Sequence, residues 1–248
     1  MPKPPKERLD KLLVERGLAE SREKAQALIM AGQVLVNGQR AEKAGVKVPL
    51  AAEIKVLGPA CPFVSRGGLK LAHALEKFGL RPEGWVCMDV GASTGGFTDC
   101  LLQAGAQKVY AIDVGKGQLH FRLRQDPRVV VMEGVNARYL KAGALPEEVD
   151  LATIDVSFIS LTKILPAVKE LVRPGGMILA LIKPQFEVGK GKVGRGGVVR
   201  DPALHEEVVA KIRRFGEELG LIFQGLTESP ILGPAGNKEF LILFQKKA

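Results

Sequence analysis

The chain has 248 residues, of which 46% are hydrophobic and 25% are charged, the usage of an ordinary globular protein. At about 150 residues per domain, this length holds one large domain or a small domain joined to a medium one. The composition excludes a disordered tail protein, a collagen and a disulfide-rich miniprotein. Its 36 Lys and Arg against 27 Asp and Glu give a net charge of +9, which favours a polyanionic partner such as nucleic acid or a membrane surface.

The three cysteines, Cys61, Cys87 and Cys100, form no Cys-x-x-Cys pair, and the three histidines are scattered. We therefore expect no metal site, no disulfide framework and a reducing cytoplasm. The N-terminal residues lack the apolar core of a signal peptide. The longest apolar run, residues 177–182, is far shorter than the ~20 residues that span a bilayer. A cytoplasmic protein without a membrane segment is predicted.

The first 58 residues predict a small α+β domain. Apolar spacing indicates one helix over residues 9–17 and a second over 21–32, with Ser21 as its N-cap. A strand at 34–36 runs into Asn37-Gly38, the strongest short hairpin signal. The alternating stretch 46–56 supplies further strand material. We expect two short helices packed on a small, strongly bent sheet.

Basic side chains gather in this domain, some at the start of the second helix, where backbone N–H groups suit a phosphate. A solvated helix face of mixed charge is the alternative. The motifs Arg8-Leu-Asp-Lys-Leu-Leu, Ser21-Arg-Glu-Lys-Ala and Gly32-Gln-Val-Leu-Val-Asn-Gly38 resemble the RNA-binding domain named after ribosomal protein S-four. The resemblance implies that the helices and the hairpin contact structured RNA. The candidate RNA-binding residues here are Arg8, Lys11, Arg16, Arg22 and Lys24.

The segment Gly58-Pro59-Ala-Cys-Pro62 interrupts the pattern, and residues 59–66 are expected to link this domain to a second one over residues 67–248. Nearly continuous apolar strands separated by helices indicate a parallel sheet that is covered on both faces. Two closing strands with a short connection suit an antiparallel hairpin. The expected strands are 85–90, 108–113, 129–133, 149–156, 177–182, 222–228 and 239–244, and the expected helices lie near 96–104 and 116–124 and at 161–172 and 202–219.

The segment Asp89-Val-Gly-Ala-Ser-Thr-Gly-Gly-Phe-Thr98 follows the first of these strands, at a position where α/β sheets bind nucleotides. Ser93 breaks the dinucleotide fingerprint, and no Lys follows the last glycine, which excludes a P-loop. Asp89 would repel a pyrophosphate, but it suits the ammonium group of S-adenosylmethionine. Asp113 is placed to accept both ribose hydroxyls, and Asn136 to contact the adenine edge.

The alternative is that the glycines only form a turn and Asp113 only caps a helix. The register of these residues on successive strands favours S-adenosylmethionine, and with it a Rossmann-like methyltransferase sheet, mostly parallel with an antiparallel last strand. The predicted cofactor-binding residues are Asp89, Gly91, Ala92, Ser93, Thr94, Gly95, Gly96, Phe97, Asp113, Val114, Asn136 and Asp155.

Four charged residues are candidates for the chemistry. Asp155 ends the fourth strand, Lys183 closes the fifth and Glu239 begins the antiparallel last strand, so these three meet at one rim of the sheet. Lys70 lies on the helix before the first strand, and spacing does not fix its direction. A ribose hydroxyl must be held in line with the methyl–sulfur bond and relieved of its proton, and a lysine can take that proton if burial and a nearby cation lower its pKa. Ordinary ion pairs at a sheet rim are the alternative.

In that order and on those elements, the four residues resemble the catalytic Lys-Asp-Lys-Glu tetrad of ribose 2′-O-methyltransferases of the FtsJ/RrmJ type. With Val64-Ser-Arg-Gly-Gly-Leu-Lys-Leu71, Lys183-Pro-Gln-Phe186 and the S-four-like domain, the chain from about residue 8 to 244 resembles the TlyA family. The resemblance implies S-adenosylmethionine as donor and a ribose 2′-hydroxyl of cytidine as acceptor. It also implies ribosomal RNA or ribosomal subunits as partners.

Residues 183–200 hold five basic residues and five glycines against one acid. Such a loop can order on a phosphate backbone, and a solvated connection is the alternative. With Arg66 from the linker, the candidate RNA contacts here are Lys190, Lys192 and Arg195.

Other functions fit less well. A base-carbon methyltransferase needs a cysteine beside the fourth or fifth strand, but none occurs after Cys100. An amino methyltransferase needs prolines where Asp155-Val-Ser-Phe158 stands. Some TlyA-like proteins carry the name haemolysin, which makes a pore-forming protein one rival. An RNA-binding factor that holds S-adenosylmethionine without turnover is the other.

Overall fold

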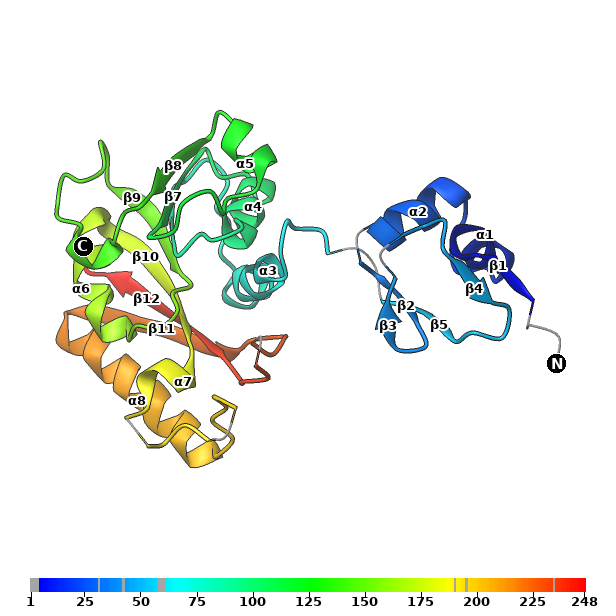
Figure 1. Cartoon of the computed structure of the whole chain (residues 1–248). Helices are drawn as coiled ribbons and strands as arrows, with labels where there is room; N and C mark the ends of the chain where they lie inside the picture. Colours follow the sequence, from blue (N-terminus) through cyan, green and yellow to red (C-terminus); the bar gives the residue numbers. More distant parts are fainter. Residues whose placement is uncertain are drawn as a thin grey trace. The chain divides into compact units, whose positions relative to one another are not determined.

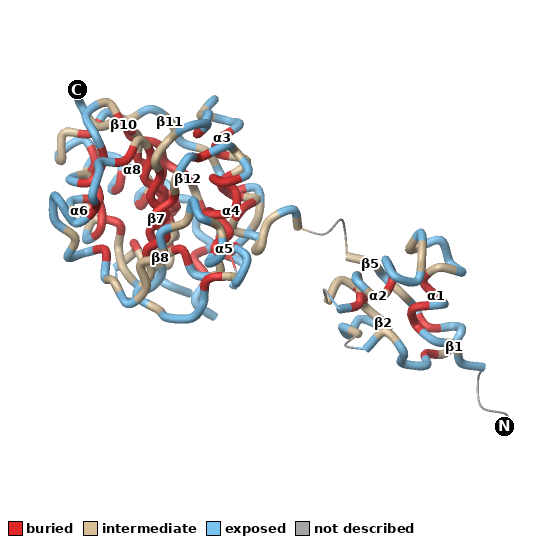
Figure 2. The backbone as a smooth tube through the Cα atoms, turned by 90° about the horizontal axis from the view of Figure 1, so that it is seen from above, coloured by how far each residue is buried: buried red, intermediate tan, exposed pale blue. Residues whose placement is uncertain are grey.

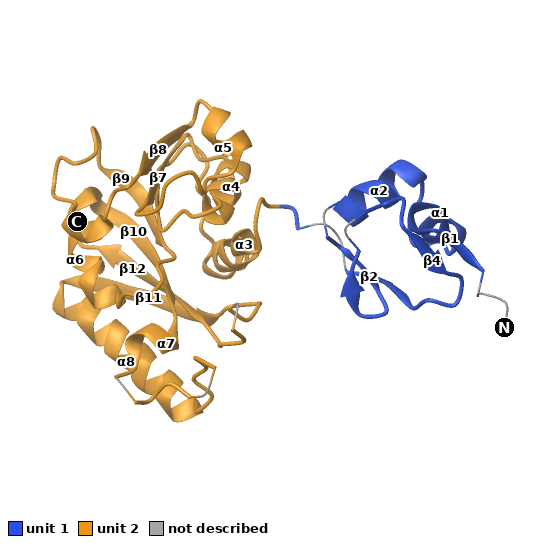
Figure 3. Cartoon of the chain, viewed as in Figure 1, with its two compact units in different colours: residues 1–62 blue, residues 63–248 orange. Residues whose placement is uncertain are grey.

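The computed structural model describes residues 5–30, 32–41, 43–57, 61–189, 191–194, 196–233 and 235–248, and its elements are labelled in Figure 1. The buried hydrophobic residues in these ranges form three clusters, one within residues 1–62 and two within residues 63–248, and Figure 2 shows where the buried residues lie. These clusters belong to two compact units, Met1–Pro62 and Phe63–Ala248 (Figure 3). The division falls inside the predicted linker.

The N-terminal unit contains two helices and two small antiparallel sheets. The helices are α1 (Leu9–Glu15) and α2 (Arg22–Met30), and the strands are β1 (Lys6–Arg8), β2 (Val34–Val36), β3 (Gln39–Arg40), β4 (Lys47–Pro49) and β5 (Ile54–Val56). The sheets have the orders β1-β4 and β3-β2-β5. The single bent sheet predicted from the sequence is thus two sheets, because β1, which the apolar pattern did not indicate, takes β4 as its partner.

Local chemistry explains the helix start and the hairpin in this unit. Ser21 Oγ accepts the backbone N–H of Lys24 at 3.2 Å, which caps α2. Asn37 and Gly38 have φ of 49° and 80°, the positive values that a type I′ turn between two strands requires. The apolar sides of α1 and α2 pack together through Leu9, Leu13 and Ile29, which are almost fully buried.

The second unit is built on a seven-stranded sheet of order β11-β12-β10-β9-β6-β7-β8. Its strands are β6 (Val86–Val90), β7 (Lys108–Asp113), β8 (Val129–Glu133), β9 (Val149–Ile154), β10 (Val172–Ile182), β11 (Leu221–Glu228) and β12 (Phe240–Lys246). Its helices are α3 (Gly67–Phe78), α4 (Gly96–Gln103), α5 (Phe121–Gln125), α6 (Leu165–Leu171), α7 (Pro184–Glu187) and α8 (Pro202–Glu218), with 3₁₀ turns η1 (Ala137–Tyr139) and η2 (Leu161–Lys163). The pairs from β10 to β8 are parallel, and β12 is antiparallel to both neighbours. This confirms the predicted fold class.

Helices cover both faces of this sheet. Successive strand residues point to opposite faces, so Cys87 of β6 packs with α3 and α4, while Met88 packs with α6 and α8. Each fully buried aliphatic side chain contributes roughly 2 kcal/mol through the area it removes from water. The strands buried on both faces explain the nearly continuous apolar runs in the sequence.

Two elements differ from the sequence prediction. The helix expected near 116–124 is only the short α5, because Gly117 has φ of 73° and cannot continue a right-handed helix. The strand expected at 177–182 begins at Val172, with an irregular register between Val172 and Met177. Neither difference moves the rim where β6, β7, β9 and β10 end and β12 begins.

Candidate active site

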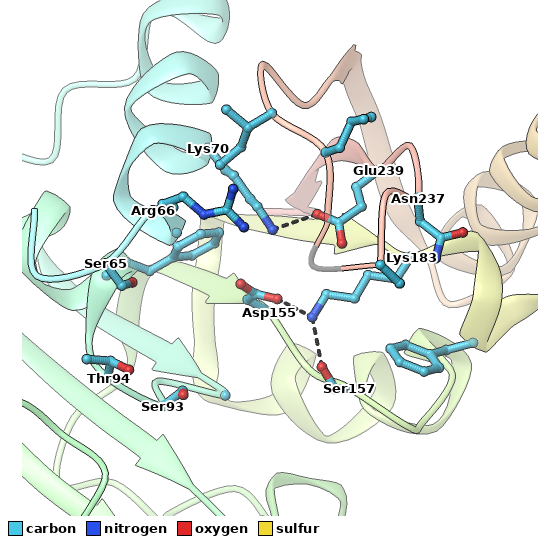
Figure 4. Close-up of a pocket in the computed structure, with 18 of the residues that line it drawn as sticks. Ser65, Arg66, Lys70, Ser93, Thr94, Asp155, Ser157, Lys183, Asn237 and Glu239 are labelled. Atoms are coloured by element: carbon cyan, nitrogen blue, oxygen red, sulfur yellow. Dashed lines mark hydrogen bonds and ion pairs between the residues drawn. The ribbon is translucent and has the colours of Figure 1, made fainter. Parts of the chain in front are cut away.

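A pocket of about 780 Å³ opens at this rim of the sheet, and all four tetrad residues line it (Figure 4). Lys70 comes from the first turn of α3, Asp155 from the loop after β9 and Lys183 from the end of β10. Glu239 directly precedes β12. Residues that lie up to 169 positions apart in the chain therefore surround one pocket.

The four side chains form two lysine–carboxylate pairs. Lys70 Nζ lies 2.6 Å from Glu239 Oε2, and both side chains are almost fully buried. Lys183 Nζ lies 2.5 Å from Asp155 Oδ1 and donates to Ser157 Oγ at 3.0 Å. Figure 4 shows the two lysine ammonium groups approaching the pocket from different elements.

Local backbone features hold these side chains in place. A Cβ on Gly68 would lie 2.2 Å from the ring of Phe63, so the start of α3 packs closely against the segment before it. Lys183 has the extended conformation, with φ of −112° and ψ of 101°, that a residue before proline prefers. The strand therefore ends at this lysine, and α7 begins with Pro184.

Besides Asp155 Oδ1, which Lys183 Nζ approaches to 2.5 Å, two buried oxygens in the pocket wall lack hydrogen-bond partners among the described residues. They are Glu239 Oε1 and Gln185 Oε1. A buried acceptor without a donor costs about 1–3 kcal/mol. Both atoms belong to residues that line the pocket, so a bound molecule with hydrogen-bond donors would satisfy them.

A second pocket, of about 440 Å³, adjoins the first. Gly91, Ser93, Asp155, Ser157 and Phe158 line both pockets. The second pocket is also lined by Asp113, Val114 and Asn136, three of the predicted cofactor-binding residues. The pair of pockets offers room for a two-part ligand that reaches from β7 to the tetrad.

The loop after β6 forms the wall between the pockets. Gly91 has φ of 86°, and a Cβ there would lie 2.4 Å from the main-chain oxygen of Asp155. Only glycine allows this close approach. Ala92, Thr94, Gly96 and Phe97 also line the first pocket, whereas Gly95 lies behind the loop, where a Cβ would meet the Leu123 side chain.

The carboxylate of Asp113 holds this loop. Its Oδ2 accepts the N–H of Ser93 at 2.8 Å, and its Oδ1 accepts the N–H of Gly115 at 2.7 Å. Each oxygen keeps a lone pair for a further donor such as a hydroxyl. Asn136 Oδ1 accepts the N–H of Arg138 at 3.1 Å and so caps η1.

Asp89 is fully buried and contributes to neither pocket wall described above. It accepts hydrogen bonds from Thr98 Oγ1 at 2.7 Å and from Thr153 Oγ1 at 3.3 Å. Burial, together with the negative charge of Asp155, raises the pKa of Asp89 to about 7. In this structure Asp89 supports the loop from behind, and its contact with a ligand ammonium group stays a prediction.

The predicted RNA-binding residues of the N-terminal unit have partners within the unit. Asp10 Oδ2 lies 2.9 Å from Arg8 and 3.1 Å from Arg22. Asp10 is fully buried, and the Arg8 guanidinium holds its pKa well below the usual range. Arg16 donates to two main-chain oxygens of residues 50 and 52.

Four further predicted RNA-binding residues lie in the described part of the chain, namely Lys11, Lys24, Arg66 and Lys192. Lys11 lies 2.9 Å from Glu7, and Lys24 pairs with Glu20. Arg66 lines the tetrad pocket, and Lys192 lies 2.9 Å from Glu207. Lys190 and Arg195 lie outside the described residues.

Several residues that line the pocket had no role assigned from the sequence. Ser157 and Phe158 stand two and three residues after Asp155, and their place in that motif was the available signal. Gln185 follows Lys183 in the same way. Asn237 is nearly fully buried; it accepts the N–H of Val199 at 2.9 Å and donates to the oxygen of Gly197 at 2.9 Å. No local pattern in the sequence signals that anchor.

No helix in the described part of the chain is long and apolar enough to cross a membrane. No group of three or more His, Cys, Asp or Glu side chains in the same residues is arranged to hold a metal ion.

The fold and the paired lysines and carboxylates define a methyltransferase of the Rossmann-like class, and comparisons agree. Residues 63–246 match the FtsJ-like methyltransferase family, and residues 7–54 match the S4 domain. "Putative rRNA methyltransferase YqxC" of Bacillus subtilis is 51% identical, over 96% of this chain and 85% of its own length. "16S/23S rRNA (cytidine-2'-O)-methyltransferase TlyA" of Mycobacterium tuberculosis is 48% identical, over 95% and 88%.

A solved structure agrees over both units. The "Putative hemolysin from Streptococcus thermophilus" is 46% identical, with a TM-score of 0.77, over 99% of this chain and 90% of that chain. The chain belongs to the TlyA family of FtsJ-like methyltransferases.

Proposed function

We propose that this chain transfers a methyl group from S-adenosylmethionine to the 2′-hydroxyl of a cytidine ribose in structured ribosomal RNA. The observation that carries the proposal is the pair of lysine–carboxylate contacts, Lys70–Glu239 and Lys183–Asp155, in one pocket. Such a substrate places the enzyme in the cytoplasm.

The second pocket fits the adenosine half of the donor. Asp113 has free lone pairs for the ribose hydroxyls, and Val114 and Asn136 line the space around the base. Gly91 lines both this pocket and the neighbouring pocket that contains the tetrad. When bound, S-adenosylmethionine supplies a methyl group on a positively charged sulfur.

Lys183 would orient the ribose hydroxyl and take its proton. Lys183 Nζ donates to Ser157 Oγ and lies at ion-pair distance from Asp155 Oδ1, which leaves the remaining position on the nitrogen, its lone pair, for the substrate hydroxyl. As the methyl group is transferred, the Lys183 amine would take the hydroxyl proton and become an ammonium, whose charge Asp155 balances. Glu239 balances the charge of Lys70.

The RNA part of the proposal is supported by the S4 domain and by the relatives' names. The M. tuberculosis relative is named for ribosomal RNA and cytidine. The net charge of +9 suits a phosphate backbone. Structured RNA is bound largely through shape, phosphates and 2′-hydroxyls, which suits a basic surface beside a ribose site.

The test is methyl transfer from labelled S-adenosylmethionine to ribosomal RNA and to isolated ribosomal subunits. We expect the modified ribose to resist alkaline cleavage, because the methylated 2′-oxygen cannot attack the adjacent phosphate. Lys183→Ala should lower the rate on the order of 10³-fold, within the range of general-base contributions. Lys163→Ala changes an exposed lysine of η2 and is the matched control. Label on a base, or transfer that survives in Lys183→Ala, would contradict the proposal.

A further inference from the structure

The loops that carry Asp155 and Lys183 are joined at a second place, away from the pocket. Glu187, the last residue of α7, reaches from the Lys183 loop to the start of η2. Its Oε1 accepts the N–H of Leu161 at 2.7 Å, and its Oε2 accepts the hydroxyl of Ser160 at 2.5 Å. These two partners end the loop that begins at Asp155.

Glu187 is a buried carboxylate with no place in the tetrad. Its side chain is 2% exposed, and it is absent from the described walls of both pockets. Lys211 of α8 donates to its main-chain oxygen at 2.8 Å and lies 3.4 Å from Oε2. A buried charge persists only where hydrogen bonds and an opposite charge compensate it, and here these partners come from η2 and α8.

The two loops therefore contact each other through three pairs of residues, and the pairs follow the same order along both loops. Lys183 contacts Asp155, the Phe186 ring lies 5.0 Å from the Phe158 ring, and Glu187 contacts Ser160. α7 is a single helical turn, so it is a short, stiff connection between the lysine and the glutamate. Because α7 is held at both ends, the direction of the Lys183 side chain is fixed.

We propose that Glu187 is a positioning residue, which clamps η2 to α7 and so sets the distance between Lys183 and Asp155. The role of that pair rests on the function proposed above. Without the carboxylate, the buried N–H of Leu161 loses its acceptor, and the hydroxyl of Ser160 keeps only its contact with Thr162 Oγ1. The loop must then shift to reach water, and the Lys183–Asp155 pair loosens.

Kinetics of Glu187→Ala test the clamp. At saturating donor and RNA we expect the turnover rate to fall on the order of 10- to 100-fold, since small displacements of reacting groups cost that much. The affinity for S-adenosylmethionine should stay within about twofold of wild type. Val109→Ala removes buried side-chain volume near the start of β7, the end of that strand that lies away from the pocket. It is the control for a variant that loses stability but keeps its turnover rate. Equal turnover of Glu187→Ala and wild type would overturn the inference.

Two further variants separate positioning from folding. Glu187→Gln keeps an acceptor for Leu161 and a polar partner for Ser160, so it should recover most of the turnover. Ser160→Ala removes the hydroxyl that donates to Glu187, together with its contacts to Thr162 at the start of η2, but leaves the Leu161–Glu187 bond. It should give an intermediate loss even if Glu187→Ala does not fold. Full activity of Ser160→Ala, or no recovery in a folded Glu187→Gln, counts against the clamp.

A crystal structure of Glu187→Ala, or of Ser160→Ala if the first variant does not fold, gives a readout that needs no substrate. We expect Lys183 Nζ and Asp155 Oδ1 to separate beyond ion-pair distance, and an unchanged pair would overturn the inference. A wild-type enzyme that methylates no RNA would instead contradict the proposed function.

Discussion

At the level of single residues, Asp89 shows how burial changes the pKa of a carboxyl group. Its carboxyl is fully buried, and its pKa is raised to about 7. Below that pH the folded protein holds a proton that the unfolded chain, with a carboxyl pKa of 3.8, has released. The folded state therefore binds more protons between these values, and its stability falls as pH rises towards 7.

We predict that Asp89→Asn removes this dependence. The stability difference, wild type minus variant, should decrease by roughly 2–3 kcal/mol from pH 5 to pH 8, at about 1.36 kcal/mol for each pH unit below the raised pKa. Urea unfolding followed by the fluorescence of Trp85, the single tryptophan, measures it. A difference that does not change with pH would show that Asp89 titrates normally.

Phe158 is the second residue whose environment indicates a role. It is 91% exposed, it has φ of 63°, and it lines both pockets. A bulky residue in the left-handed region is strained by about 1–3 kcal/mol, and its exposure offers no burial in return. An aromatic face at this position would stack on the base beside the target ribose.

We predict that Phe158→Leu lowers methyl transfer at subsaturating RNA by roughly 10-fold, since base stacking contributes about 1–3 kcal/mol. Its unfolding free energy should change little, because the Phe158 side chain is exposed. Phe121→Leu alters another exposed phenylalanine, away from the described pocket walls, and should behave as wild type. Equal losses in both variants would remove the special role of Phe158.

At the scale of the element, the loop after β6 depends on one close approach. Gly91→Ala would place a Cβ 2.4 Å from the oxygen of Asp155, whereas Gly143, with similar φ of 81°, has open space around it. The comparison separates a steric clash from backbone strain alone.

We predict that Gly143→Ala costs about 1 kcal/mol of unfolding free energy. Gly91→Ala should cost more and should also weaken binding of S-adenosylmethionine, because the loop must move away from β9. Calorimetric titration and urea unfolding of both variants measure these effects. Similar costs and unchanged donor affinity in both would contradict the role of the close approach.

The sequence predicted the elements of the second unit well because its strands are buried on both faces and its helices are bounded by turn residues. The sequence also placed Asp155 and Lys183 at strand ends, because each of them stands where an apolar strand segment stops. It did not fix Lys70, because the direction of α3 depends on packing against α4 and on the contact between Gly68 and Phe63. The short β1 and the contacts of Glu187 and Asn237 are tertiary, and no periodic pattern signals them.

At the scale of the whole molecule, the positive charge is shared by the two units. Residues 1–62 hold 11 basic and 7 acidic residues, a net +4, and residues 63–248 hold 25 and 20, a net +5. Many of these cations already have carboxylate partners. The buried Asp10 holds Arg8 and Arg22 side by side while their side chains stay about half exposed, which suits two contacts with one RNA backbone.

We predict that Arg8→Ala and Arg22→Ala each weaken RNA binding and lower the slope of log affinity against log salt by about 1, as expected for loss of one phosphate contact. Arg213→Ala, which changes an exposed arginine paired with Glu217 on α8, should leave the slope unchanged. Filter binding over a range of salt measures these slopes. Unchanged slopes in the first two variants would assign the arginines a purely structural role.

The central claim is ribose methylation of ribosomal RNA by the tetrad. Its most direct test maps 2′-O-methylated nucleotides in ribosomal RNA from cells that lack this protein, complemented with wild type or with Lys183→Ala. We expect a cytidine that resists alkaline cleavage only when the wild-type protein is present. Identical maps in all three strains, or a cytidine methylated equally by the Lys183→Ala protein, would contradict it.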